Sequence, residues 1–572
     1  MTLDDARYRA YHLLTLAAIP LVQLVVHPSL FVTPGGNQFI DAWVYTGFFV
    51  SLPAHIQRFG GTYYANRLPW ILPGFVLHRF LPPVAASYVL HLTFFYVLLA
   101  AMYMLVARAV NRSAALFAAL LVAWQPAILG ALGWDYVDGA GIVYLVLALL
   151  CVERATGPRH AVAWSFGAGM AGACAIVTNL SLVAFTPAFA VFLWLRAAPD
   201  RRTVVVVRTM AASAAGAAVM VAAFALLYRS LGGAWWFLEP SVRISRQLYG
   251  SITPWHTPFL VFPWYRASWL AIPFSAGLGA LVSLAAPPPG QSTFARAAQA
   301  MLLMVIAAFL INDLAARTSF LQYAYYATYI VPFALLALPM QAAAPPWTER
   351  LSVVVRFEVL TIVTLAASHL LLVANGGALW SAALIRLHAT QPTDRLLVAT
   401  VIATAAGLLA VGSLRLLRPA ATAWTVFAIA VACSYVALPP GWSSGIDGRD
   451  DFEDTVRAHR FITRSIDGRA IRIWSCAPSK FSPPFHSISS TYLWGWVLIN
   501  EELPALTTTA AATLQPGTRL VLLLNREAEA DEARNALRPF GFDFGVIAQE
   551  EFGPAKRPFL VVIADLVRRP AG

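Results

Sequence analysis

Long apolar runs alternate with short polar segments over the first 438 residues of the chain. Most of these runs approach the roughly 20 residues that a helix needs to cross a bilayer. The pattern predicts thirteen membrane helices, an odd number that places the two ends of the chain on opposite sides of the membrane. Their expected ranges are 13–32, 84–106, 114–132, 136–152, 161–178, 180–195, 204–228, 268–286, 298–315, 321–340, 353–373, 396–413 and 420–438.

Two of the segments between these helices are long, at 33–83 and 229–267. Both are rich in aromatic residues and proline, which is unlike the composition of a flexible linker. Apolar residues recur at four-residue spacing in the first of them, at Ile40, Val44, Phe48 and Leu52. This spacing predicts a helix with one apolar face that lies along the membrane surface.

The pattern changes after residue 438. An acidic amphipathic segment at 450–466 precedes short runs of strand-forming residues at 470–476, 519–524, 545–548 and 559–564, with a charged helical segment at 527–538 between them. The sequence therefore predicts two parts, a membrane module over 1–438 and a small α/β domain over 439–572. The second part contains neither a GxGxxG nor a Walker pattern, so nothing in it indicates a nucleotide site.

Composition excludes a soluble globular protein. Hydrophobic residues make up 59% of the chain and charged residues only 12%, with a mean hydropathy of +0.66. Soluble proteins carry about 25% charged residues. A chain this poor in charge cannot cover its surface with polar groups, so lipid must be the solvent for much of it. The fold class expected is a polytopic α-helical membrane protein.

The net charge of +12 comes almost entirely from arginine. No basic cluster interleaved with aromatic residues appears, so a nucleic-acid partner is not expected. With the N-terminus in the cytoplasm, fourteen arginines fall in inside segments and three in short outside loops. Because arginine accumulates in cytoplasmic loops, this orientation is favoured. The C-terminal domain is then extracytoplasmic, and the expected location is the plasma membrane, in bacteria the inner membrane.

Several residues that carry chemistry gather at the expected outer boundary of the membrane. A carboxylate in a partly desolvated place can act as a general base, and an arginine beside it can hold a phosphate. An interfacial aspartate is also a common helix cap, and interfacial tyrosines commonly form an aromatic belt. The residues concerned are Asp41 in FIDAWVYTG, Tyr63, Tyr64 and Arg67 in GTYYANRLPW, and Asp135 and Asp138 in GWDYVDG.

This combination resembles the GT-C membrane glycosyltransferases, in particular the branch of protein O-mannosyltransferases and aminoarabinose lipid A transferases. Members of that branch carry a catalytic aspartate in the first long outside loop, which matches Asp41, and a tyrosine and a basic residue before a proline further on, which match Tyr64, Arg67 and Pro69. They also have an aromatic stretch ending in proline before a late helix, like YYATYIVP at 325–332, and often a final outside domain.

Two positions depart from the patterns of that branch. The aminoarabinose type has an acid directly before the basic loop residue, where this chain has Asn66. The mannosyltransferase type has a glutamate directly after the aspartate, where this chain has Ala42. The sugar specificity of neither subgroup is therefore carried over, and the acceptor, whether glycan, lipid or protein, is not indicated.

The resemblance implies an inverting transfer of a sugar from a polyprenyl-phosphate donor to an acceptor hydroxyl, with Asp41 as general base. The donor-binding residues it implies are Tyr64, Arg67, Tyr325 and Tyr326, joined by Arg243, Arg246 and Arg266 from the second long loop; Asp135, Asp138 and Tyr63 have acceptor or supporting roles. No cofactor is expected. A divalent ion is disfavoured although the three carboxylates are suitable ligands, because the arginines already supply positive charge at the leaving phosphate.

Two other readings remain open from the residues. A flippase or transporter of lipid-linked glycans would also be polytopic, but ion-coupled carriers place ionisable groups near the bilayer midplane. Here Arg208, Glu358, His91, Asp313 and His369 fall near the ends of the expected helices. An O-antigen ligase or polymerase would share the outside chemistry and use a diphosphate-linked donor.

Overall fold

The computed structural model describes residues 3–26, 40–133, 136–248, 268–285, 287, 291–315, 318–342, 457–458, 460–462, 464–465, 471–476, 500–503, 514–524, 528–552 and 559–569. The expected helices at 353–373, 396–413 and 420–438 lie outside these ranges.

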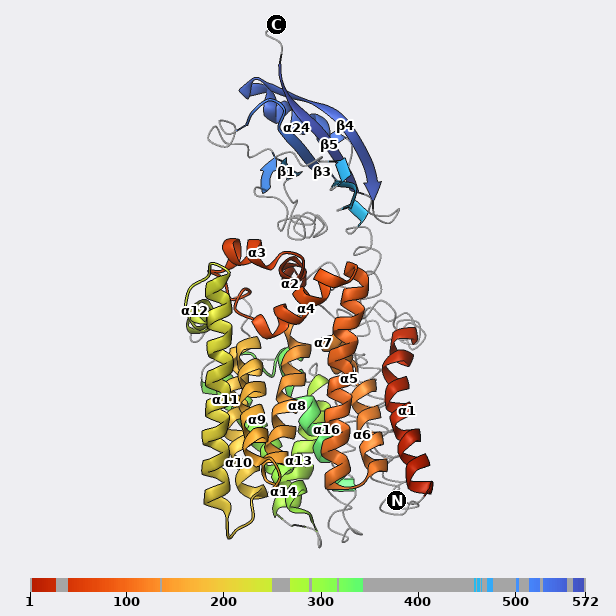
Figure 1. The fold of residues 1–572 in the computed structure, drawn as a ribbon, viewed down its shortest axis with the longest axis vertical. Coiled ribbons are helices and arrows are strands. Elements are labelled where there is room, and N and C mark those ends of the chain that lie inside the picture. Colours follow the sequence, from red (N-terminus) through yellow and green to blue (C-terminus); the bar gives the residue numbers. More distant parts are fainter. Residues whose placement is uncertain are drawn as a thin grey trace, which may run out of the picture.

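The described part of the first 342 residues is helical (Figure 1). Each of the first ten expected membrane ranges overlaps one or more of the observed helices. The helices are α1 (Leu3–Val26), α2 (Ile40–Val50), α3 (Leu52–Phe59), α4 (Leu68–Phe80), α5 (Pro83–Ala109), α6 (Arg112–Trp124), α7 (Pro126–Gly133), α8 (Val137–Ala155), α9 (Ala161–Thr178), η2 (Leu180–Ala184), α10 (Phe185–Arg196), α11 (Arg202–Ser230), α12 (Glu239–Leu248), η4 (Ser268–Leu270), α13 (Ala271–Ala285), α14 (Thr293–Ala315), α15 (Ala324–Ala327), η5 (Thr328–Ile330) and α16 (Val331–Ala342).

Four helices within the described residues, α5, α9, α11 and α14, are long and apolar enough to cross a membrane. A fifth span results if α6 and α7 count as one, although they meet at a bend of 64°. This break falls in the expected range 114–132, where Gln125 leaves the helix before Pro126 because proline disfavours helical backbone in the residue that precedes it. These helices make the chain a multi-pass membrane protein. The total of thirteen membrane helices stays a prediction.

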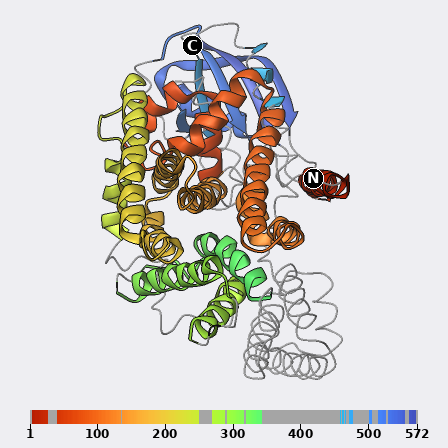
Figure 2. The ribbon, with the colours of Figure 1, turned by 60° about the horizontal axis from the view of Figure 1, so that its bottom comes forward.

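The bundle packs closely where α9 meets α11. A methyl group added at Gly169 would lie 1.8 Å from the Ser213 carbonyl oxygen, and one added at Gly216 would lie 2.1 Å from that of Phe166. The Ser213 hydroxyl also donates to the Ser165 carbonyl at 2.8 Å. Small residues let membrane helices approach until their backbones touch. Figure 2 shows the green helices α13, α14 and α16 packed together along another side of the bundle.

The short helices α2, α3 and α4 lie across one end of the bundle (Figure 1). The stripe predicted from four-residue spacing is part of α2 and the start of α3. Val44, Phe48 and Leu52 are buried in the main apolar core, so these members of the stripe pack against protein rather than against a membrane surface. Gly74 of α4 permits this packing, because Phe49 occupies the space where a side chain would stand.

The C-terminal part contains a five-stranded sheet in the order β2-β1-β3-β5-β4. The strands β2, β1 and β3 are parallel, and β5 and β4 join antiparallel to them. Helix α24 (Ala528–Leu537) packs on one face, and Ala458 and Ile462 pack on the other. The strands are β1 (Ile471–Cys476), β2 (Asn500–Leu503), β3 (Arg519–Leu524), β4 (Phe542–Phe552) and β5 (Phe559–Arg568). The domain boundary at 438 and the extracytoplasmic location of this part stay predictions.

Candidate functional site

Arg67 lies in the loop between α3 and α4, directly before the first residue of α4. Its Nη1 donates a hydrogen bond to the Tyr45 hydroxyl at 3.0 Å. Its Cζ lies 4.9 Å from the centre of the Tyr63 ring and 5.6 Å from that of Tyr136. Three segments distant in the sequence, α2, the α3–α4 loop and the start of α8, therefore place a tyrosine around one guanidinium group.

These tyrosines affect the pKa of Arg67 as well as its position. Burial by itself lowers the pKa of Arg67, but the neighbouring Tyr45, Tyr136 and Tyr63 raise it, and the net pKa lies well above the ordinary value. Arg67 is half-buried and stays a cation at any physiological pH.

The loop that carries Arg67 is held in place from several helices. Tyr228 of α11 donates to the Gly60 carbonyl at 2.6 Å, and Arg243 of α12 donates to the Gly61 carbonyl at 3.0 Å. The buried Asn66 side chain donates to Ser241 Oγ at 3.0 Å. Asn66, which stands where the aminoarabinose type has an acid, thus ties the loop to α12.

Asp138 is the second residue of α8 and is fully buried. Its Oδ1 accepts a hydrogen bond from the Tyr329 hydroxyl at 2.6 Å, and the same hydroxyl is 3.4 Å from Asn179 Nδ2. Tyr329 also lies in the neighbourhood of Arg67. A carboxylate in the first turn of a helix also interacts favourably with the positive end of the helix dipole, so part of the role of Asp138 is structural.

The structure therefore brings four of the predicted residues into one cluster. Tyr63 and Tyr64 stack with ring centres 4.1 Å apart, and Tyr64 meets the edge of Tyr45 at 5.8 Å. Arg67 lies against Tyr63. Asp138 joins them through its bond to Tyr329 and through Tyr136, which directly precedes α8.

Other predicted residues lie apart from this cluster or outside the described residues. The backbone of Asp41 forms the second position of α2, one helical turn before Tyr45, and its side chain is outside the description. Asp135 and Arg266 fall outside the described residues. Arg243 and Arg246 are exposed on α12, where Arg243 lies 3.6 Å from Glu239 in addition to its bond to Gly61.

Tyr325 and Tyr326 belong to a second aromatic cluster, next along the chain to Tyr329. Their ring centres are 4.4 Å apart, and they pack against Tyr323 at 5.3 Å and Phe320 at 5.1 Å, respectively.

Asp313 at the end of α14 holds the loop that leads into this second cluster. Its carboxylate accepts hydrogen bonds from the Thr318 hydroxyl at 2.6 Å and from the backbone amides of Phe320 and Leu321 at 2.7 and 2.8 Å. The buried acid at the end of α14 thus has a structural role here.

Three tyrosines of the site, Tyr45, Tyr136 and Tyr329, were not singled out from the sequence. Tyr45 stands four residues after Asp41, a spacing of one helical turn, and this was an available signal. Tyr136 lies inside the GWDYVDG motif, and Tyr329 lies inside the aromatic stretch before Pro332.

Among the described residues, no group of three or more His, Cys, Asp or Glu side chains is placed to hold a metal ion. The side chains of Asp41 and Asp135 lie outside the described part of the chain, so independence from metal stays a prediction.

These elements form the GT-C fold, which the sequence resemblance had led us to expect. ArnT from Cupriavidus metallidurans bound to undecaprenyl phosphate shares the fold, with a TM-score of 0.54 and 14% identity over 96% of this chain and 97% of that chain. The same protein in the apo state gives a TM-score of 0.51, also at 14% identity, over 97% and 98%. No protein-family model and no curated protein sequence matches the chain.

Proposed function

We propose that the chain is a membrane glycosyltransferase that moves a sugar from a polyprenyl-phosphate donor to an acceptor hydroxyl at the extracytoplasmic face, with inversion at the anomeric carbon. The observation that carries this proposal is Arg67, held by three tyrosines at one end of a bundle with the fold of ArnT. ArnT was solved with undecaprenyl phosphate. A fixed, half-buried guanidinium suits a lipid-linked phosphate, because its planar donors match phosphate oxygens.

In this mechanism Asp41 accepts the proton of the acceptor hydroxyl, and the hydroxyl oxygen attacks the anomeric carbon. The bond between that carbon and the phosphate oxygen breaks, and its electron pair stays on the phosphate. Arg67 stabilises the negative charge that develops there. The products are the glycosylated acceptor and free polyprenyl phosphate, and the proton remains on Asp41 until solvent takes it.

The remaining site residues have supporting roles in this proposal. Tyr45 and Tyr63 fix the orientation of the Arg67 guanidinium group, and Tyr64 stacks on the Tyr63 ring and supports it. The buried pair of Asp138 and Tyr329 orients the acceptor side of the site.

The outer residues complete the proposed donor site. Tyr325 and Tyr326 offer hydroxyls from the second cluster, and the second-loop arginines Arg243, Arg246 and Arg266 add positive charge for the donor. Asp135 supports the acceptor next to Asp138.

The test uses lipid extracts from cells that lack the gene, in which the unused donor should accumulate. Purified protein in detergent is incubated with this extract and acceptor-containing membranes, and polyprenyl lipids are followed by mass spectrometry. We expect loss of one polyprenyl-phosphate sugar and appearance of free polyprenyl phosphate.

Detergent micelles have no leaflets, so this experiment also separates the alternatives. A flippase would leave every lipid-linked sugar intact, and a ligase that uses a diphosphate donor would release polyprenyl diphosphate. Either result would overturn the proposal.

A further inference from the structure

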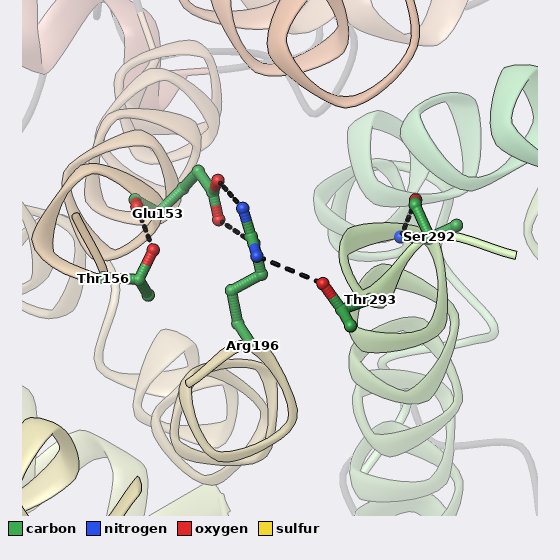
Figure 3. A network of polar contacts seen from close by, with 6 residues as sticks. Glu153, Thr156, Arg196, Ser292 and Thr293 are labelled. Atoms are coloured by element: carbon green, nitrogen blue, oxygen red, sulfur yellow. Dashed lines mark hydrogen bonds and ion pairs between the residues drawn. The ribbon is translucent and has the colours of Figure 1, made fainter. Parts of the chain in front are cut away.

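At the end of α8 opposite Asp138, Glu153 and Arg196 form a fork of two hydrogen bonds (Figure 3). Arg196 Nε and Nη2 each lie 2.9 Å from a carboxylate oxygen of Glu153, and Nη1 donates to Thr293 Oγ1 at 3.1 Å. Glu153 is buried and Arg196 is half-buried. The charge of this carboxylate is therefore neutralised by Arg196.

Two further arginines, Arg154 and Arg208, lie beside this pair. Neither forms a salt bridge within the described part of the chain, although Arg154 is close enough to Glu153 to interact with its charge. The Cζ of Arg154 lies 5.7 Å from the centre of the Trp164 ring, and Arg208 Nη2 donates to the Ala155 carbonyl at 3.3 Å. The Nε atoms of Arg154 and Arg208 are buried and have no hydrogen-bond partner within the described part of the chain. Both arginines are half-buried as whole residues, so other parts of the two side chains stay accessible.

The surroundings add positive charge rather than removing it. Arg108 of α5 lies near Glu153, and Arg202 of α11 lies 5.3 Å from the centre of the Trp194 ring. In the segments 107–113, 153–160 and 196–208 the carboxylates are Glu153 and Asp200, and Asp200 lies 3.4 Å from the exposed Arg201. A partly buried cation without a counter-ion is unfavourable, so this end of the bundle favours an anion.

The helices that carry these arginines also expose apolar side chains. On α11 Val204, Val207 and Met210 are 69%, 61% and 56% exposed, and on α9 Val162 is 59% exposed. Because α9 and α11 pack directly together, cationic and apolar groups share one part of the surface. The ligand that fits both is an anion that carries apolar chains.

We propose that Arg154 and Arg208 bind the phosphate of an anionic phospholipid, whose acyl chains lie along α9 and α11. The planar guanidinium groups donate to the phosphate oxygens, and the Trp164 ring supports Arg154 from beside it. Basic pockets between membrane helices on the cytoplasmic side are suited to such headgroups. This site goes beyond the proposed glycosyl transfer, since it lies at the other end of α8 from Asp138.

The test measures binding of phosphatidylglycerol and of phosphatidylcholine to the purified full chain in detergent by native mass spectrometry. Wild type should retain phosphatidylglycerol in preference to phosphatidylcholine. The double variant Arg154→Gln/Arg208→Gln should bind phosphatidylglycerol at least about tenfold more weakly, since each basic residue adds measurably to the affinity for an anionic headgroup. A matched control, Arg159→Gln/Arg201→Gln, removes two exposed arginines from the same end and should bind like wild type.

Inorganic phosphate at millimolar concentration distinguishes a lipid headgroup from a free anion. Retention of phosphatidylglycerol in its presence supports the lipid, while complete displacement shows a site for soluble phosphate and overturns the assignment. Equal binding by the two double variants also overturns it. If the double variant Arg154→Gln/Arg208→Gln aggregates, the single variant Arg208→Gln replaces it, because the described hydrogen bond of Arg208 goes to a backbone carbonyl. Unchanged binding of phosphatidylglycerol by Arg208→Gln contradicts the proposal.

Discussion

The Tyr329 hydroxyl donates a hydrogen bond of 2.6 Å to Asp138 Oδ1, across 191 positions of the sequence. Gly141, one turn further along α8, makes room for this contact. A methyl group at Gly141 would lie 2.8 Å from Tyr329 Cε1 and 3.1 Å from its hydroxyl oxygen. The pair therefore depends on a residue that has no side chain.

We predict that Gly141→Ala displaces Tyr329 and destabilises the protein by about 1–3 kcal/mol, the usual cost of overpacking a core. Thermal melting of the purified protein in detergent measures the change. Gly172→Ala is the control, because nothing lies within 4 Å of a methyl group there and alanine favours a helix interior by roughly 0.5–1 kcal/mol. Equal melting temperatures for the two variants would show that Tyr329 is not tightly held.

Asp41→Asn keeps the size of the side chain and removes its basicity. We predict a loss of at least about a hundredfold in transfer rate, the lower end of the effect of a general base. Expression and binding of undecaprenyl phosphate should stay normal, since the substitution leaves Arg67 in place. Transfer at a near-normal rate would make Asp41 a structural residue of α2.

Substitutions at Arg67 should weaken binding of the donor phosphate in graded steps. Arg67→Lys keeps the charge and loses the planar fork, and Arg67→Ala loses both. Binding of undecaprenyl phosphate, followed by quenching of tryptophan fluorescence, should fall from wild type to Lys to Ala. Tyr45→Phe removes the hydroxyl that Arg67 contacts and should cause a smaller loss than either. Equal affinity in all four proteins would remove Arg67 from the phosphate site.

Transfer should continue in excess EDTA, because the cation needed at the leaving phosphate is Arg67. The assay uses purified protein, donor-containing extract and acceptor membranes. Activity that disappears with EDTA and returns with Mg²⁺ or Mn²⁺ would assign Asp135 and Asp138 as metal ligands and contradict the prediction.

A reporter fused after Gly572 should be active only outside the cytoplasm. The arginine distribution places the N-terminus inside, and thirteen helices place the other end outside. Alkaline phosphatase, which matures only outside, and a cytoplasmic fluorescent protein form the pair of fusions. A cytoplasmic signal would require an even number of helices or the opposite orientation.

Within the described residues, hydropathy located the first ten expected helices, because each membrane helix satisfies its own backbone hydrogen bonds and its length follows from local sequence. It missed the 64° bend between α6 and α7, although Pro126 signals it, because a window average does not register a single turn. Short runs of strand-forming residues likewise identified most of the strands, but their order in the sheet depends on contacts that no local pattern encodes.

The site was harder to predict for a related reason. Arg67, Tyr64 and Asp138 lie in motifs that are polar enough to stand out at a membrane boundary. Tyr45 and Tyr329 look like ordinary interfacial tyrosines until the fold places one against Arg67 and the other against Asp138. Their roles come from long-range packing, and a single sequence does not contain that information.

Helix α11 reaches from the arginine cluster to the loop that carries Arg67. Arg208 bonds to the end of α8, and Tyr228, twenty residues later on the same helix, bonds to Gly60. At 1.5 Å per residue this separation is about 30 Å, roughly the thickness of the hydrocarbon layer. One continuous rod thus joins the two faces of the protein, and a tilt of that rod in the bilayer would shift both of its attachments together.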